Sequence, residues 1–336
     1  MIQDALARLL DGRDLSRAEA REAMGEIMRG EATPAQIGGF LVALRLKGET
    51  VNEIAGCAEA MRDHVLPVEP RRADLVDTAG TGGDGAHTLN ISTAAALVAA
   101  AAGAGVAKHG NRAVSSASGS ADVLEALGFR LELEPARIAR SIDELGFGFM
   151  FAPTHHPAMR HAAPVRRELA ARTIFNVLGP LTNPARARAQ IVGVYSAELV
   201  PTIAEVLASL GAHRAFVVHG AGGIDELSPA GPNLVCEVVG GEVRRREIDP
   251  VQLGLERCGE DELRGGSPAE NASAIRAVFA GENGARRSAI VLNAAGAIAA
   301  AGHAEDLREG LELARETVDS GAAAARLDEL VEFSRG

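Results

Sequence analysis

The sequence predicts an α/β protein, with a small all-helical domain and a larger α/β domain that has a mostly parallel central sheet. The first 66 or so residues carry only helix-type patterns. From Leu75 onward, short apolar runs alternate with helical ones, as in chains of β-α-β units. The length of 336 residues is enough for two such domains.

Four helices are expected in the N-terminal part. Ser16 begins a Ser-Arg-Ala-Glu capping box, Thr33 and Pro34 open a third helix, and a fourth spans 51–65 before Pro67. Several apolar faces in so short a segment suit packing within one chain or against a second copy. The residues alone leave both possibilities open.

The α/β part is expected to alternate strands and helices in a regular order. Strands are expected to end at Lys108 and to span 147–151, 190–195 and 214–219, with a hairpin of 234–239 and 242–248 joined by Gly240 and Gly241. Helices are expected over 118–127, 135–145, 157–170, 173–178, 197–210 and 289–301.

The composition excludes several classes of function. Aromatic residues make up 3% of the chain and the net charge is −11, which argues against a nucleic-acid partner. The cysteines, Cys57, Cys236 and Cys258, have neither disulfide nor metal spacing, as is typical of a reducing cytoplasm. The N-terminus lacks a signal-peptide layout, and the uncharged run 94–107 is too short to cross a bilayer. A soluble, cytoplasmic protein with no membrane partner is therefore expected.

A glycine-rich loop carries the first functional signal. The run from Asp77 to Gly85 reads DTAGTGGDG, and NIST follows at 90–93. A strand, bare backbone N–H groups and a helix start together favour a phosphate ligand, although a tight turn without a ligand has the same pattern. The glycine spacing also fits a dinucleotide-binding loop. That class needs an acid about 20 residues on, where this chain has none, and Asp84 would repel a bound pyrophosphate.

Three more segments carry side chains suited to an anionic substrate. The run KHGNR from Lys108, with serines from 115 to 120, is a second phosphate-type loop at a strand end, so a ligand with two phosphate groups is favoured. His156, Arg160 and Arg166 lie near one face of an expected helix, where a guanidinium could bind a carboxylate. Asp225 and the adjacent Glu226 could hold Mg²⁺ together with substrate phosphate oxygens.

Together these segments resemble the anthranilate phosphoribosyltransferases. The matching runs are DTAGTGGDG, NIST, KHGNRAVSSASGSADVLEALG, FAPTHHPAMRHAAPVRRELAARTIFNVLGPLTNPA and GGIDELSP, and the similarity extends over nearly the whole chain. The resemblance implies transfer of the 5-phosphoribosyl group from phosphoribosyl pyrophosphate to the amine of anthranilate, in L-tryptophan biosynthesis. Pyrophosphate leaves, and Mg²⁺, expected as two ions per monomer, assists.

The same resemblance implies an architecture shared with class II nucleoside phosphorylases. A helical domain of residues 1–70 would be joined in space by about 163–187. Residues 71–162 and 188–336 would form the α/β domain that binds phosphoribosyl pyrophosphate. A homodimer through the helical domain is expected.

The resemblance also assigns residues to ligands. Those for phosphoribosyl pyrophosphate are Gly80, Thr81, Gly82, Gly83, Asp84, Thr88, Asn90, Ser92, Thr93, Lys108, His109, Gly110, Asn111 and Ser120. Those for anthranilate are Gly80, His109, Asn111, His156, Arg166, Gly179 and Pro180, with Arg166 taking the carboxylate. Those for the metal are Ser92, Asp225 and Glu226. Many family members have a Lys or another long residue where this chain has Ala117, which leaves a phosphate contact at that position open.

No residue is assigned as a general base, because the aniline-type amine of anthranilate is already neutral at pH 7. Catalysis would then come from positioning and from neutralising the departing pyrophosphate.

Two other functions fit parts of the pattern. A pyrimidine nucleoside phosphorylase of the same fold normally has Lys and His ahead of the first glycines, where this chain has Asp77 and Thr78. A non-catalytic nucleic-acid-binding relative would not need the acids at 225 and 226, and the acidic balance argues against it.

Overall fold

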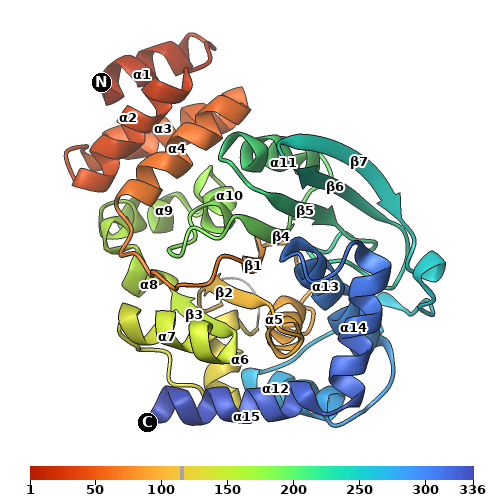
Figure 1. Cartoon of the computed structure of the whole chain (residues 1–336). Coiled ribbons are helices and arrows are strands. Elements are labelled where there is room, and N and C mark those ends of the chain that lie inside the picture. Colours follow the sequence, from red (N-terminus) through yellow and green to blue (C-terminus); the bar gives the residue numbers. More distant parts are fainter. Residues whose placement is uncertain (114–116) are drawn as a thin grey trace.

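The computed structural model describes residues 1–113 and 117–336. Within these residues, a bundle of N-terminal helices lies against one side of a larger part that is built around a seven-stranded sheet (Figure 1). The C-terminal helix runs along the far side of the larger part, away from the bundle (Figure 1). The structure thus confirms the predicted combination of a helical part and an α/β part.

The sheet has the strand order β3-β2-β1-β4-β5-β6-β7. Strands β3, β2, β1, β4 and β5 are parallel to one another, and β6 and β7 are antiparallel additions at one edge. The strands are β1 (Leu75–Gly80), β2 (Gly105–Gly110), β3 (Phe147–Phe151), β4 (Ala189–Gly193), β5 (Arg214–His219), β6 (Asn233–Val239) and β7 (Glu242–Ile248).

The N-terminal bundle consists of α1 (Ile2–Leu10), α2 (Arg17–Arg29), α3 (Pro34–Lys47) and α4 (Val51–Asp63). The other helices are α5 (Ile91–Ala101), α6 (Ser120–Leu127), α7 (Pro135–Leu145), α8 (Ala152–His155), α9 (Ala163–Leu169), α10 (Phe175–Leu178), α11 (Leu199–Ser209), α12 (Pro268–Phe279), α13 (Ala285–Ala300), α14 (Leu307–Asp319) and α15 (Ala322–Arg335). Short 3₁₀ turns are η1 (Pro157–His161), η2 (Gly179–Leu181), η3 (Pro250–Leu253) and η4 (Glu260–Leu263).

The starts of the bundle helices follow from local chemistry. Ser16, Thr33 and Thr50 each accept a hydrogen bond from a backbone N–H in the first turn, and the side chain three residues on bonds back. These reciprocal bonds satisfy N–H groups that the helix itself leaves unpaired. The capping box predicted at Ser16 and the helix start predicted at Thr33 are confirmed.

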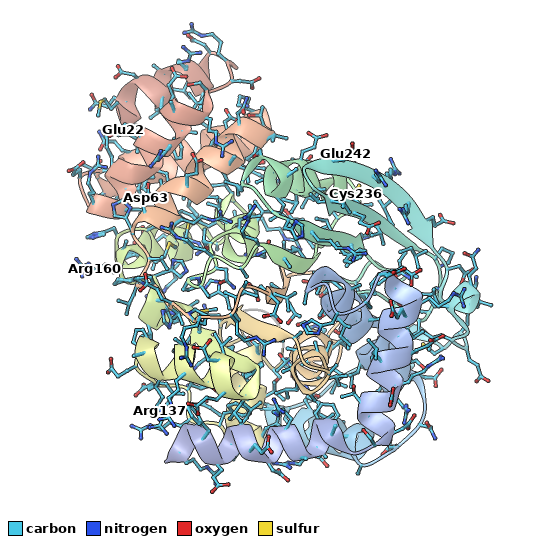
Figure 2. The ribbon with its side chains drawn as sticks, in the orientation of Figure 1. Glu22, Asp63, Arg137, Arg160, Cys236 and Glu242 are labelled. Atoms are coloured by element: carbon cyan, nitrogen blue, oxygen red, sulfur yellow. The ribbon has the colours of Figure 1, made fainter. Side chains whose placement is uncertain are left out.

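The edge hairpin also follows from its turn. Gly240 and Gly241 have φ angles of 57° and 90°, which glycine adopts without strain and which the tightest hairpin turns require. Strand β7 is mostly exposed and carries three consecutive arginines, Arg244 to Arg246, between glutamates. Glu242, at its start, lies on the outer margin of the molecule (Figure 2).

Two large apolar cores cover the two faces of the sheet. One joins the alanine-rich helices α5 and α13 to one face. Small side chains let backbones approach closely there, and a side chain at Gly310 of α14 would lie 2.6 Å from the carbonyl oxygen of Ala295. The other core is continuous from the bundle through α9, α10 and α11 to the opposite face of β4, β5 and β6.

One predicted helix is wrong in its extent. Residues 157–170 form two separate segments, η1 and α9, with α8 just before them. Pro164 lacks the N–H that a helix continuing from Pro157 would use, so the run breaks at Ala162, just before it. Arg160 consequently lies on the exposed outer side (Figure 2), where its Nε contacts His161. Among the described residues, no helix has the length and apolar character needed to cross a membrane.

Candidate active site

The predicted ligand loops meet at the carboxyl edge of the parallel strands. Strand β1 lies between β2 and β4, so the chain leaves it toward β2 and later returns on its other side at β4. In open α/β sheets such a reversal opens a crevice at the strand ends. The glycine loop follows β1, the KHGNR loop begins in β2, and the loop with Asp225 follows β5.

The glycine loop is held in an extended, sharply turning form. Thr81 N donates to the Gly193 carbonyl at 2.9 Å, and Thr81 Oγ1 accepts from Tyr195 N at 3.1 Å, which ties the loop to the end of β4. Gly82 and Gly83 have φ angles of 68° and 77°, in the left-handed region that side chains disfavour. The sharp turn of the loop therefore depends on glycine.

Asp225 and Glu226 accept hydrogen bonds from the glycine loop and from the first turn of α5. Asp225 Oδ2 accepts from Gly82 N at 2.6 Å, and Glu226 Oε1 accepts from Ser92 N in the first turn of α5 at 3.0 Å. The backbone N–H of Asp225 donates to Asp84 Oδ2 at 3.3 Å. The close approach of the Asp225 backbone to β4 requires a glycine in that strand, because a Cβ at Gly193 would lie 1.5 Å from the Asp225 carbonyl oxygen.

Both acids hold their protons more tightly than usual. Burial raises the pKa of Asp225 to about 7, and the nearby charge of Asp84 adds to the shift. Burial and the charge of Asp225 raise the pKa of Glu226 to about 8. A cation placed between such carboxylates would relieve their repulsion, so this group fits Mg²⁺ in charge and in ligand type.

The acids would supply only part of a metal coordination shell. In the part of the chain that the structure describes, no three His, Cys, Asp or Glu side chains gather closely enough to hold a metal ion on their own. Ser92, Asp225 and Glu226 would thus share the ion with oxygens of the substrate and of water, as is common for Mg²⁺.

Lys108 lies beneath the loops, with 2% of its surface exposed. Its Nζ donates to the carbonyl oxygen of Thr78 and, at 3.2 Å, to Thr78 Oγ1. Burial lowers the pKa of Lys108, and the charges of Asp77 and Glu226 oppose that shift. The lysine is therefore a buried side chain between β1 and β2, within the electrostatic reach of Asp77 and Glu226.

The second loop is fastened to the first by side-chain contacts. Asn90 Nδ2 donates to the Ser118 carbonyl at 3.0 Å, and Ser120 Oγ donates to the Asn111 carbonyl at 3.2 Å. A Cβ at Gly110 would lie 2.2 Å from Ser120 Oγ, so the loop turns against the start of α6. Of the serines predicted here, those at 115 and 116 lie outside the described residues.

The polar residues predicted near the start of α5 differ in burial and in their contacts. Thr93 is buried, and its Oγ1 has no partner among the described residues. Thr88 forms an isolated antiparallel bridge with Arg264, which draws it toward η4. Asn90 Oδ1 accepts from Asn271 Nδ2 of α12 at 2.9 Å.

Two histidines predicted to face anthranilate lie together. The ring centroids of His109 and His156 are 4.9 Å apart, and both rings are buried. Burial lowers the pKa of His109 to about 3 and that of His156 to about 4, so both are neutral at pH 7. His109 Nδ1 contacts the Gly179 carbonyl at 3.2 Å and must be the protonated nitrogen. Its Nε2 is a buried acceptor without a partner among the described residues.

Arg166 of α9 is half-buried, with its guanidinium carbon 4.9 Å from the centre of the Phe175 ring. Burial lowers its pKa. Within residues 1–113 and 117–336 it forms no ion pair with an acid, unlike many other arginines of the chain. A buried guanidinium without a carboxylate is suited to receive one from a ligand.

Sequence reasoning missed three residues next to the site. Asp77 and Asn183 form a buried hydrogen bond of 2.7 Å beneath it. Arg172 donates to the Gly83 carbonyl and lies 4.3 Å from the centre of the Tyr195 ring. The sequence did indicate a role for Asp77, since an acid inside an apolar strand has to be paired with a polar partner. No sequence signal separates Arg172 from its neighbouring arginines.

Two family models match the chain. The helical bundle domain of the glycosyl transferase family matches residues 3–65, and the a/b domain of the same family matches residues 72–324. The fold and the site therefore define a glycosyl transferase with a helical bundle beside an α/β domain.

Relatives narrow this class. The chain is 56% identical to anthranilate phosphoribosyltransferase of Anaeromyxobacter sp. (strain Fw109-5), over 100% of this chain and 99% of that one. Its structure is similar to that of anthranilate phosphoribosyltransferase from Thermus thermophilus, with a TM-score of 0.94, 49% identity and coverage of 99% and 100%. The chain belongs to the anthranilate phosphoribosyltransferase family.

A more distant relative has been solved with ligands. Anthranilate phosphoribosyltransferase from Saccharomyces cerevisiae, in complex with PRPP (phosphoribosyl pyrophosphate) and Mg, has a TM-score of 0.90, 29% identity and coverage of 99% of this chain and 98% of that one. In complex with 4-fluoroanthranilate, the yeast protein has a TM-score of 0.88, 28% identity and coverage of 99% and 97%.

Proposed function

We propose that this chain transfers the 5-phosphoribosyl group from phosphoribosyl pyrophosphate to the amine of anthranilate, giving N-(5-phosphoribosyl)anthranilate and pyrophosphate in L-tryptophan biosynthesis. The observation that carries the proposal is the direct bonding of Asp225 and Glu226 to the glycine loop and to the start of α5. These bonds hold a pair of acids of the kind that binds Mg²⁺ against a loop of the kind that binds phosphate. Family membership favours this reaction over a nucleoside phosphorylase or a nucleic-acid-binding relative.

The donor would lie over the glycine loop. We assign its contacts to the backbone of Gly80 through Asp84 and to the hydroxyl and amide groups of Thr88, Asn90, Ser92 and Thr93. Further contacts are assigned to Lys108, His109, Gly110, Asn111 and Ser120. Mg²⁺, which we propose binds as two ions per monomer at Ser92, Asp225 and Glu226, would supply positive charge for the departing pyrophosphate. The buried Lys108 lies beneath the same loops, where the charges of Asp77 and Glu226 favour its protonated form against the effect of burial.

The acceptor would lie against a wall formed by His109, His156 and the Gly179–Pro180 turn, with its carboxylate on Arg166. In the reaction the amine nitrogen forms a bond to C1 of the ribose as the C1–O bond to pyrophosphate breaks, and the resulting ammonium then gives up its proton to water. His109 Nε2 and His156 Nε2 are neutral acceptors that can orient the N–H groups of the amine. Because both histidines have such low pKa values, neither is assigned as a general base.

We also propose a homodimer through the helical bundle. Leu10 of α1 is 73% exposed, and Val42 and Leu46 of α3 are 40% and 82% exposed. A helix with apolar residues on its outer side needs a partner to cover them.

Residues 163–187 would belong to this domain, since Val165 packs against Gly38 of α3. The three free cysteines support a cytoplasmic location.

The test is an omission series. Anthranilate fluorescence should decay when the protein, phosphoribosyl pyrophosphate and Mg²⁺ are all present, and should stay constant when any one is left out. Free base released from thymidine and phosphate without phosphoribosyl pyrophosphate would instead assign a nucleoside phosphorylase.

A further inference from the structure

The turn that would face the acceptor is held by side chains from three other elements. The Gly179 carbonyl contacts His109 Nδ1 at 3.2 Å, the Pro180 carbonyl accepts from Gln190 Nε2 at 3.0 Å, and the Leu181 carbonyl accepts from Arg62 Nε at 2.7 Å. Three successive backbone carbonyls are thus fixed from β2, β4 and α4. A short turn with so many outside contacts has little freedom to shift.

Beneath this turn, one carboxylate connects it to the backbone of His109. Asp77 of β1 is fully buried. Its Oδ1 accepts from the backbone N–H of His109 at 3.1 Å, and its Oδ2 accepts from Asn183 Nδ2 at 2.7 Å. The same Asn183 nitrogen donates to the Ala107 carbonyl at 2.8 Å, and Asn183 Oδ1 accepts from Ala185 N at 2.9 Å. Every hydrogen-bonding atom of Asn183's side chain is therefore in use.

We propose that Asp77 is a positioning residue, which fixes the acceptor-facing wall by holding the His109 backbone and the 179–183 turn to one carboxylate. The inference rests on the proposed function, because it takes His109 and the Gly179–Pro180 turn, which contact each other, as one wall of the acceptor site. Asp77 is fully buried behind that wall, so it would act through His109 and Asn183.

The geometry explains why this position needs a carboxylate. Two oxygens, on opposite sides of one carbon, accept from two donors that belong to different parts of the chain. An asparagine at 77 has a single acceptor oxygen, so it can keep the His109 N–H or the Asn183 amide but not both. The amide nitrogen of this asparagine is itself a donor, so it would lie opposite the other N–H donor without forming a hydrogen bond. Burial raises the pKa of Asp77 to about 6, so keeping an ionised carboxylate at this position costs free energy.

The test compares three variants of the full-length enzyme. Asp77→Asn keeps the volume and removes one acceptor, and Asn183→Ala removes the other half of the contact while leaving Asp77 and His109 paired. Ser141→Ala is the matched control, because Ser141 Oγ donates to the Phe147 carbonyl at 2.7 Å, a buried bond at the amino edge of the sheet. Measurements are KM for each substrate, kcat, Tm, and anthranilate Kd from fluorescence.

We expect Asp77→Asn and Asn183→Ala to raise KM and Kd for anthranilate on the order of tenfold, because the wall facing the acceptor loses its anchor. KM for phosphoribosyl pyrophosphate should change less than about threefold. Ser141→Ala should lower Tm without moving either KM.

The outcomes separate the two levels of inference. Equal rises in both KM values, or a fall in Tm with unchanged anthranilate binding, would overturn the positioning role while the reaction stands. If Asp77→Asn does not fold, the same comparison is made with Asn183→Ala alone. A wild-type protein that neither binds nor converts anthranilate would reject the proposed function, and the acceptor-pocket role of Asp77 with it.

Discussion

Replacing Arg166 with alanine should separate the two substrates kinetically. Arg166 is half-buried on the Phe175 ring and forms no ion pair with an acid in the described part of the chain. A ligand carboxylate would give this guanidinium its first such partner. Its removal should therefore weaken anthranilate and leave the pyrophosphate end of the donor untouched.

The magnitude follows from the kind of bond that is lost. A hydrogen bond to a charged group contributes about 1.5–3 kcal/mol, and a planar guanidinium can make two such bonds to one carboxylate. Solvent that reaches the half-buried site offsets part of this. We expect a loss of about 2–3 kcal/mol, which is roughly a 30- to 150-fold fall in kcat/KM for anthranilate.

The assay is initial-rate fluorescence with each substrate varied in turn. Arg167→Ala is the control, because Arg167 is on the same helix but exposed, and it should lower kcat/KM less than about threefold. Arg166→Lys keeps the charge without the planar fork and should fall between wild type and alanine. Equal losses for both substrates, or a loss in Arg167→Ala as large as in Arg166→Ala, would refute the carboxylate assignment.

Three further results are expected. The double variant Asp225→Asn with Glu226→Gln should lose Mg²⁺-dependent turnover, and near-normal activity would reject the metal assignment. Because the raised pKa values, about 7 and about 8, mean that the folded chain holds these protons more tightly than the unfolded chain, Tm without Mg²⁺ should fall as the pH rises from about 5 to about 8 and level off above that. Mg²⁺ should raise Tm more at pH 8 than at pH 6, and a pH-independent increment in calorimetry would contradict this. Leu46→Asp should give monomers in light scattering, whereas Val251→Asp, exposed on η3, should not; a monomeric wild type would reject the dimer.

Elements with local signals were predictable from the sequence. The hairpin bounds depend on two glycines, and the start of α3 depends on Thr33 with Pro34, so each is decided within a few residues. The ligand loops could also be placed at one edge, since parallel strands all end there. What remains a prediction is which ligand each of these residues contacts.

Other features depend on contacts distant in sequence. The proline at 164 was visible, but the prediction of one helix over 157–170 did not take it into account, and the run breaks just before it. The direction of Lys108, back toward Thr78, is set by the neighbouring strand, about 30 residues away. The bond between Asp77 and Asn183 joins positions 106 residues apart, and no local pattern indicates such a pair.

Strand β7 has a consequence for how copies of this protein can associate. An open sheet edge offers unpaired backbone groups to any other strand, and fibrous aggregates grow from such edges. Here the edge carries Arg244, Arg245 and Arg246 among glutamates, and Arg246 pairs with Glu237 of β6 at 3.2 Å. Two copies approaching edge to edge in antiparallel fashion would bring arginine against arginine. This charge repulsion makes open-ended growth through the sheet unfavourable, and it leaves the exposed apolar residues of the N-terminal bundle as a more favourable place for contact.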